Sequence, residues 1–169
     1  MSLESHRSSA PKALRFAVLT VSDTRDAATD RGGPFLVDGL AAAGHTTTVR
    51  AIVKDDAAEI TAAVRAALAR DDVDLVLTTG GTGIAPRDVT VPTLERLFDA
   101  EIPGFGELFR MLSYQEIGSA AMLSRACAGL VAGKVVLALP GSPKALRLAL
   151  EKLVLPEAGH LAAEAAKRT

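Results

Sequence analysis

The sequence predicts an α/β fold with a mostly parallel sheet. Short runs of β-branched residues alternate with alanine-rich stretches of helical length, a pattern typical of strand–helix–strand units. One run, VDLVL, is too apolar for a strand with one face in water, which indicates a sheet covered on both sides. A chain of 169 residues is about one domain's worth, so we expect a single core.

The first half of the chain predicts three strands joined by two helices. The strands are expected at residues 15–21, 46–53 and 73–77. A helix over residues 34–43 ends at a glycine, and a second over residues 57–70 carries apolar side chains at helical spacing. This order is that of a parallel sheet.

The second half predicts further helices and one antiparallel pair. Helices are expected at residues 91–98, 105–112 and 120–123. Strands over residues 125–130 and 134–139 flank the tripeptide VAG, a spacing that suits a hairpin and so gives the sheet one antiparallel hairpin strand.

The C-terminal region predicts two helices. Ser142 and Pro143 form an N-cap followed by a proline at the first helical position. The helix over residues 144–155 is expected to stop at Pro156, and residues 157–169 are expected to form a last helix.

Residues 1–14 are expected to be a flexible N-terminal tail, and residues 15–169 the domain itself. The first dozen residues are polar and serine-rich and lack the apolar segment of a secretion signal. No apolar run approaches the roughly 20 residues of a membrane span. One cysteine allows no internal disulfide, which fits a reducing compartment. We therefore expect a cytoplasmic protein without a membrane partner.

The charge balance argues against extended polyanions as partners. Lys and Arg number 19 against 20 for Asp and Glu, so the net charge is −1. With no Trp and one Tyr, the chain also lacks platforms on which single-stranded nucleic acids stack. Three scattered histidines and one cysteine do not have the spacing of a zinc site. No nucleic-acid partner is expected.

Polar, turn-forming segments follow four of the predicted strands. If these strands are parallel, all four segments lie at the carboxyl edge of the sheet, where open α/β sheets bind ligands. This convergence is the main functional signal in the residues. The segments are Ser22-Asp23-Thr24, Lys54-Asp55-Asp56, Thr78-Thr79-Gly80-Gly81-Thr82-Gly83 and Pro140-Gly141-Ser142-Pro143.

The segment TTGGTG is the strongest single motif. Gly80, Gly81 and Gly83 allow tight turns that expose backbone N–H groups, and Thr79 and Thr82 add hydroxyls, so the loop could cradle a phosphate. It matches neither the Walker A spacing nor GxGxxG. A strained connector between strand and helix is the plain alternative, but the hydroxyls and the position at the sheet edge favour phosphate binding.

Asp55 and Asp88 are the candidate catalytic and metal-binding carboxylates. Two carboxylates facing a phosphate cradle would hold Mg²⁺ between themselves and the phosphates. Taken alone, an aspartate such as Asp88 near a helix start is more often a helix cap or dipole partner than a catalytic residue. Beside it, Arg87 is a candidate anion partner and Thr90 a candidate cap and phosphate ligand. Asp23 could join this edge or close an Asx turn.

The segment from Pro140 to Pro143 predicts a second anion site, because Ser142 would cap a helix whose first amides are free. Capping alone explains it about as well. Arg125 is a further candidate anion partner, although such a residue taken singly is most often a surface charge.

Several ordered motifs, headed by TTGGTGIAPRDVT, resemble the MoaB/MogA family of molybdenum cofactor biosynthesis proteins, which is related to the gephyrin G domain. The resemblance covers residues 16–161 and looks more like MoaB than MogA. It implies a three-layer α/β/α sandwich that assembles as trimers, with MoaB members often hexameric. The other motifs are VSDT, DRGG, PGFGELFR, AMLSR and LPGSP.

The resemblance also implies molybdopterin adenylylation. In that reaction the terminal phosphate of molybdopterin attacks the α-phosphorus of ATP, and adenylyl-molybdopterin and pyrophosphate are formed. Asp55 and Asp88 match the family's two critical aspartates, while Lys54 stands where the family commonly has proline. Segments that line the family's substrate pocket match residues 80–83, Ser142 and the Ser124-Arg125 pair.

Two other functions remain open. The chain could be a pterin-binding or carrier protein of the same pathway that does no adenylylation, in which case molybdopterin would bind without ATP turnover. A purely structural oligomer is the third possibility, but it leaves the polar segments at the sheet edge unexplained.

Overall fold

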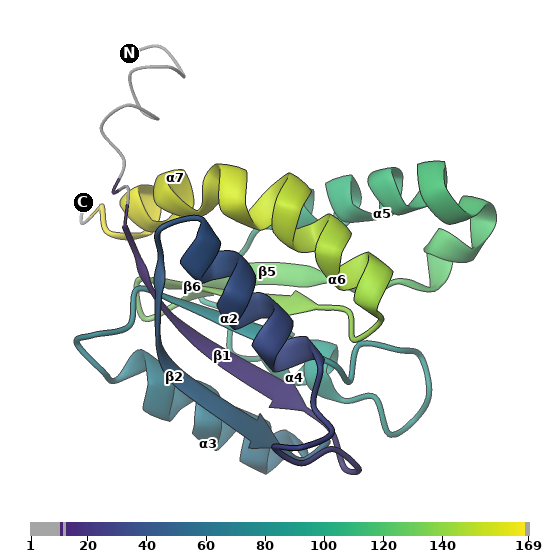
Figure 1. Ribbon diagram of the computed structural model, residues 1–169, viewed down its shortest axis with the longest axis horizontal. Helices are drawn as coiled ribbons and strands as arrows, with labels where there is room; N and C mark the ends of the chain where they lie inside the picture. The colour runs from purple at the N-terminus through teal and green to yellow at the C-terminus, as the bar shows by residue number, and fades with distance from the viewer. Residues whose placement is uncertain (1–10, 12, 168–169) are drawn as a thin grey trace.

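A six-stranded sheet lies between two layers of helices in the computed structural model, which describes residue 11 and residues 13–167 (Figure 1). The strand order is β2-β1-β3-β6-β5-β4. The first four strands in this order are parallel, β5 is antiparallel to β6, and β4 is antiparallel to β5. The strands are β1 (Arg15–Val21), β2 (Thr46–Val53), β3 (Leu75–Thr79), β4 (Ala100–Glu101), β5 (Cys127–Val131) and β6 (Lys134–Leu139).

Helices cover both faces of the sheet, which confirms the predicted fold class. Figure 1 shows α2, α5, α6 and α7 above the sheet and α3 and α4 below it. The helical segments are α2 (Gly32–Ala42), α3 (Ala57–Leu68), α4 (Thr90–Glu95), α5 (Pro103–Ile117), the 3₁₀ turn η1 (Gly118–Leu123), α6 (Pro143–Ala149), the π-helical turn η2 (Leu150–Val154) and α7 (Leu155–Ala165).

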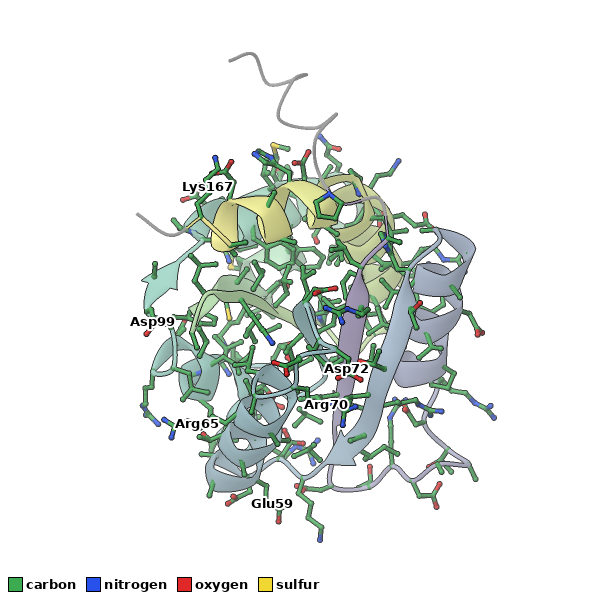
Figure 2. The ribbon with its side chains drawn as sticks, turned by 90° about the vertical axis from the view of Figure 1, so that its left-hand side faces the viewer. Glu59, Arg65, Arg70, Asp72, Asp99 and Lys167 are labelled. Carbon is green, nitrogen blue, oxygen red and sulfur yellow. The ribbon has the colours of Figure 1, made fainter. Side chains whose placement is uncertain are left out.

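The two faces of the sheet form two separate cores. Along β1, Phe16 and Val18 pack into the core between the sheet and helices α2 and α6. Ala17 and Leu19 pack into the core between the sheet and helices α3 and α4. All four side chains are buried, as the uninterrupted apolar sequence of this strand predicts. The charged side chains of α3, such as Glu59 and Arg65, lie on its outer face (Figure 2).

Several boundaries differ from those expected. Strand β3 ends two residues later than predicted because Thr78 and Thr79 still pair with β1 and β6. The short β4 was not predicted, and α5 extends beyond residues 105–112 at both ends. The expected break at Pro156 is wrong. The π-helical turn η2 replaces the ordinary helical hydrogen bonds just before this proline, and α7 continues through it.

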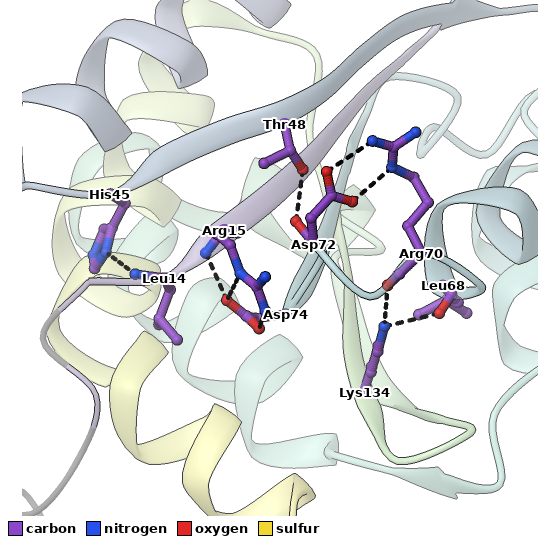
Figure 3. Close-up of polar contacts among 9 residues, drawn as sticks. All are labelled: Leu14, Arg15, His45, Thr48, Leu68, Arg70, Asp72, Asp74 and Lys134. Carbon is purple, nitrogen blue, oxygen red and sulfur yellow. Dashed lines mark hydrogen bonds and ion pairs between the residues drawn. The ribbon is translucent and has the colours of Figure 1, made fainter.

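The amino edge of the sheet is fixed by ion pairs and helix-end contacts (Figure 3). Arg15 at the start of β1 pairs with Asp74 at 2.7 Å, just before β3. The ammonium of Lys134 at the start of β6 donates to the carbonyls of Leu68 and Arg70 at the end of α3. At this edge, charged side chains form contacts that hold strands and helices together.

The expected tail falls almost entirely outside the described residues. Within them, Pro11 is exposed, but Leu14 is already buried and its N–H donates to Nδ1 of His45. No helix in the described part of the chain has the length and apolar character needed to cross a membrane.

Asp30 is a buried carboxylate that joins β1, β2 and α2. Oδ1 accepts from the N–H groups of Gly32 and Gly33 at the start of α2. Oδ2 accepts from the Thr20 hydroxyl at 2.9 Å and from the Arg50 guanidinium at 3.2 Å. Burial opposes ionisation, but these hydrogen bonds outweigh it and hold the pKa of Asp30 below its ordinary value.

Replacing Asp30 with alanine should lower the free energy of unfolding by about 2–4 kcal/mol, because buried donors lose their acceptor. Because the pKa is lower in the folded chain than in the unfolded chain, the stabilisation is present above about pH 4 and is lost as the pH falls through the folded value. Urea denaturation at one fixed protein concentration measures both effects. The control is Asp72→Ala, which removes an exposed pair with Arg70 and should cost less than about 1 kcal/mol. Equal losses in the two variants would contradict this role for Asp30.

Candidate functional site

The four predicted polar loops lie at one edge of the sheet, because β1, β2, β3 and β6 are parallel. The chain leaves β1 toward α2 on one face and leaves β3 toward α4 on the other face. The carboxyl ends of β1 and β3 therefore lie at a switch point of the topology, the position at which open α/β sheets bind ligands. The candidate site is built around these two strand ends.

The glycines after β3 bring the loop backbone close to neighbouring elements. Gly80 has φ +98°, and a Cβ there would collide with the carbonyl of Val21 at the end of β1. Gly81 has φ +62°, and a Cβ there would collide with Oδ1 of Asp55 and Oγ1 of Thr90. Only glycine permits both the left-handed conformation and these contacts.

Asp55 lies at the end of β2, half-buried, in a negatively charged environment. Its N–H donates to Oδ1 of Asp23 at 3.1 Å. This hydrogen bond joins the loop that follows β2 to the loop that follows β1. Burial first, and then the charges of Asp23 and Asp88, raise the pKa of Asp55, while Arg87 opposes the shift. Oδ1 of Asp55 is buried without a hydrogen-bond partner among the described residues.

Asp88 folds back onto its own loop. Oδ2 accepts from the N–H of Ala85 at 3.0 Å, and a Cβ at Gly83 would collide with this oxygen. The carboxylate therefore closes the turn between the glycine loop and α4. The negative charge of Asp88 also contributes to the raised pKa of Asp55. The neighbouring Arg87 is exposed and is the cation that acts on Asp55.

Arg125 holds the loop that carries Asp88. Its guanidinium donates to the carbonyls of Thr82, Gly83 and Asp88, the last at 2.8 Å. The sequence indicated a cation at this edge but not this contact, because carbonyl acceptors leave no pattern in the residue types. Ser124, half-buried, immediately precedes it.

The hydroxyls of the loops serve different purposes. Thr79 donates to the carbonyl of Pro140, which connects the β3 and β6 loops, and Gly141 lies against Gly80. Ser22 accepts from the N–H groups of two residues that follow it. Thr82 is buried beside the glycines.

Two helix starts differ from the caps predicted for them. Ser142 occupies the predicted N-cap position of α6 and is exposed, but its side chain makes no capping hydrogen bond. The expectation that Thr90 caps a helix is wrong, because Thr90 is the first residue of α4 and its hydroxyl has no hydrogen-bond partner. By contrast, Asp56 caps α3 through the N–H groups of Ala58 and Glu59.

The described residues hold no group of three or more His, Cys, Asp or Glu side chains placed to bind a metal. A divalent cation at this edge would therefore need ligands besides carboxylates. Mg²⁺ is commonly bound in this way, through one or two carboxylates together with phosphates and water. Cys127 is not a candidate nucleophile, because burial first, and then nearby glutamates, raise its pKa to about 12.

A hollow of about 650 Å³ lies beside this edge, between the end of α5 and the start of α6. Lys144 and Arg147 contribute positive charge to its wall, and Ile117 contributes an apolar surface. Neither Arg147 nor the hollow was predicted, since helix packing alone brings these side chains together. An adjoining hollow of about 500 Å³ is lined by Ser142, which links this space to the β6 loop.

The carboxyl of Asp55 should titrate above the ordinary aspartate value. Asp23→Asn removes one of the like charges and keeps an oxygen that can accept from the N–H of Asp55, so the Asp55 midpoint should fall in this variant. Carboxyl ¹³C chemical shifts recorded across the acidic pH range measure this, with Asp55→Asn used to assign the resonance. Asp38→Asn, an exposed change on α2, should leave the midpoint in place. An Asp55 midpoint at or below the ordinary value would contradict the described electrostatics.

Comparison with known proteins agrees with this architecture. Residues 17–160 match the family described as a probable molybdopterin binding domain. Molybdenum cofactor biosynthesis protein B of Bacillus anthracis is 53% identical over 165 residues, which cover 97% of this chain and 98% of that protein.

Solved structures show the same fold. A crystal structure of a molybdenum cofactor biosynthesis protein B superposes with a TM-score of 0.91 at 53% identity, covering 94% of this chain and 99% of the other. The tungsten cofactor synthesizing protein MoaB from Pyrococcus furiosus superposes with a TM-score of 0.84 at 38% identity, covering 94% and 100%. On this similarity along nearly the whole sequence, the chain belongs to the MoaB/MogA family of molybdenum cofactor biosynthesis proteins.

Proposed function

We propose that this protein is a Mg²⁺-dependent molybdopterin adenylyltransferase. The terminal phosphate of molybdopterin attacks the α-phosphorus of ATP, one P–O bond forms as another breaks, and pyrophosphate leaves. The observation that carries the proposal is the meeting of Asp55, Asp88 and the glycine loop at the carboxyl ends of β1 and β3. Membership of a family with a molybdopterin-binding domain supports the choice of substrate.

The reaction requires positioning more than proton transfer. A phosphate monoester has its second pKa near 6, so this nucleophile is largely deprotonated at neutral pH. The site therefore needs no strong general base. The main barrier is the repulsion between two polyanions that must approach each other. Hydrogen-bond donors that hold them in line for the reaction lower this barrier.

The chain's own residues can provide this positioning. The backbone of residues 80–83 turns through two left-handed glycines and is held in place by Thr90, whose N–H donates to the carbonyl of Gly81 at 3.1 Å. Arg125 fixes the following turn through its carbonyls. The N–H of Gly80 donates to the carbonyl of Leu139, so the N–H groups of residues 81–83 are the ones that would bind phosphate oxygens in this fixed loop.

Asp55 and Asp88 fit a magnesium ion. Asp55 has a buried oxygen without a partner, and the charges of Asp23 and Asp88 favour a cation nearby. Two carboxylates together with the phosphates form a suitable oxygen donor set. When bound, Mg²⁺ would neutralise charge on the phosphate oxygens. The hollow between α5 and α6, which is lined by three basic and two acidic side chains, offers space for the organic part of a substrate.

Incubation of the purified protein with molybdopterin, ATP and Mg²⁺ should yield adenylyl-molybdopterin and pyrophosphate in equal amounts. Asp88→Asn keeps an oxygen for the turn to Ala85 but removes the charge, and should lower the rate by about a hundredfold or more. Asp38→Asn, exposed on α2, serves as the control and should keep full activity.

Failure of the wild-type protein to form product would contradict the proposal. Molybdopterin binding without ATP turnover would instead support the second candidate, a carrier protein of the same pathway. That candidate is favoured by one observation, the match to a molybdopterin-binding domain, which by itself does not require catalysis.

We further propose that the protein is a homo-oligomer, a trimer or hexamer, assembled through α5 and η1. These segments expose apolar side chains at Leu108, Met111, Tyr114, Ile117 and Met122, each at least 48% accessible. The first four recur every third residue along α5 and form a stripe, which marks an interaction surface.

Light scattering should therefore give a mass of three or six chains for the wild-type protein. Tyr114→Arg should reduce this mass, because it places a charge in the apolar stripe. Ile84→Arg changes an equally exposed apolar residue outside the stripe and should leave the mass unchanged. A monomeric wild-type protein would contradict the proposal.

A further inference from the structure

Two buried oxygens without partners lie together at the site. Oδ1 of Asp55 follows β2, and Oγ1 of Thr90 belongs to the first residue of α4; the Thr90 residue is 0% exposed. Buried polar atoms nearly always have a hydrogen-bond partner, so each exception requires an explanation. The described residues contain two other such atoms, in Thr47 and Thr93, and neither is among the atoms nearest to Gly81.

Both oxygens lie close to Gly81, where no side chain separates them. A Cβ on Gly81 would collide with Asp55 Oδ1 and Thr90 Oγ1 at once, so the two oxygens border the same small volume. The carbonyl of Gly81 accepts from the N–H of Thr90, which fixes the loop and the helix start relative to each other. The relative position of the two oxygens is therefore set by the fold.

The charge around this space favours a cation. Asp23 and Asp88 both act on Asp55 as like charges, and Arg87 opposes them. Arg125 is already bonded to the loop carbonyls. A carboxylate together with a threonine or serine hydroxyl is the donor pair that holds Mg²⁺ in P-loop nucleotide-binding proteins, although this loop is unrelated to them in sequence pattern.

We propose that Asp55 Oδ1 and Thr90 Oγ1 together hold a divalent cation above Gly81. Thr90 is then a metal ligand in addition to the two carboxylates of the proposed function, and not a helix cap. The identification of this cation with the magnesium of an adenylyl transfer rests on the proposed function. The cation-binding pair itself is a property of the ligand-free protein and can be tested without substrates.

Titration of the purified protein with Mn²⁺ alone at neutral pH, followed by electron paramagnetic resonance of the free ion, tests the pair directly. The wild-type protein should bind one Mn²⁺ that Mg²⁺ displaces. Thr90→Val keeps the shape of the side chain and removes the hydroxyl, and should weaken binding by about 10-fold or more. Thr90→Ser retains the hydroxyl and should restore binding.

Thr93→Val is the matched control, because Thr93 also lies on α4, is buried, and has a hydroxyl without a hydrogen-bond partner. It should bind Mn²⁺ like the wild-type protein. If Thr90→Val fails to fold, as judged by its circular dichroism, Thr90→Ala replaces it with the same expected loss.

Three results would overturn the proposal: no saturable Mn²⁺ binding by the wild-type protein, normal binding by a folded Thr90→Val or Thr90→Ala variant, or an equal loss in Thr93→Val. Failure of the proposed function is distinguishable. If the protein binds Mn²⁺ through Thr90 but forms no adenylyl-molybdopterin, the cation-binding pair is supported and the adenylyltransferase function is contradicted.

Discussion

The parallel pairing of β1 with β3 determines where everything else in this protein can lie. Their register places Thr20 beside Thr79, so the two strands end within one residue of each other. The chain then leaves them in opposite directions, toward α2 and α4, and only glycine fits at position 80, where the β3 loop passes the carbonyl of Val21. The candidate site is thus a consequence of strand direction and of one close backbone approach.

Two aspartates near this edge show how the same side chain can serve structure or function. Asp30 has four hydrogen-bond donors, and its pKa is lowered although the residue is buried. Asp55 has an oxygen without a donor and two like charges nearby, and its pKa is raised. A satisfied carboxylate stabilises the fold, whereas an unsatisfied one retains an affinity for a cation or donor that the chain does not supply.

The sequence was informative wherever local patterns determine structure. Strands β1, β2 and β6 and the convergence of four loops were predicted, because apolar runs and turn residues report on backbone conformation. The start of α6 at Ser142 and Pro143 was predicted for the same reason.

Contacts between distant segments could not be predicted. The hydrogen bonds from Arg125 end on carbonyls, which every residue carries, and the hollow beside α6 depends on how α5 packs. Thr90 was predicted to cap a helix because threonine is a common capping residue, whereas the structure leaves its hydroxyl without a hydrogen-bond partner. Pro156 looked like a helix end because a π-helical turn leaves little trace in sequence.

A crystal structure with Mn²⁺ and a non-hydrolysable ATP analogue tests most directly whether this edge of the sheet is the reaction site. An anomalous peak beside Asp55, with the triphosphate along residues 80–83, is the expected result. A nucleotide bound elsewhere on the protein, with no metal near Asp55, would contradict it.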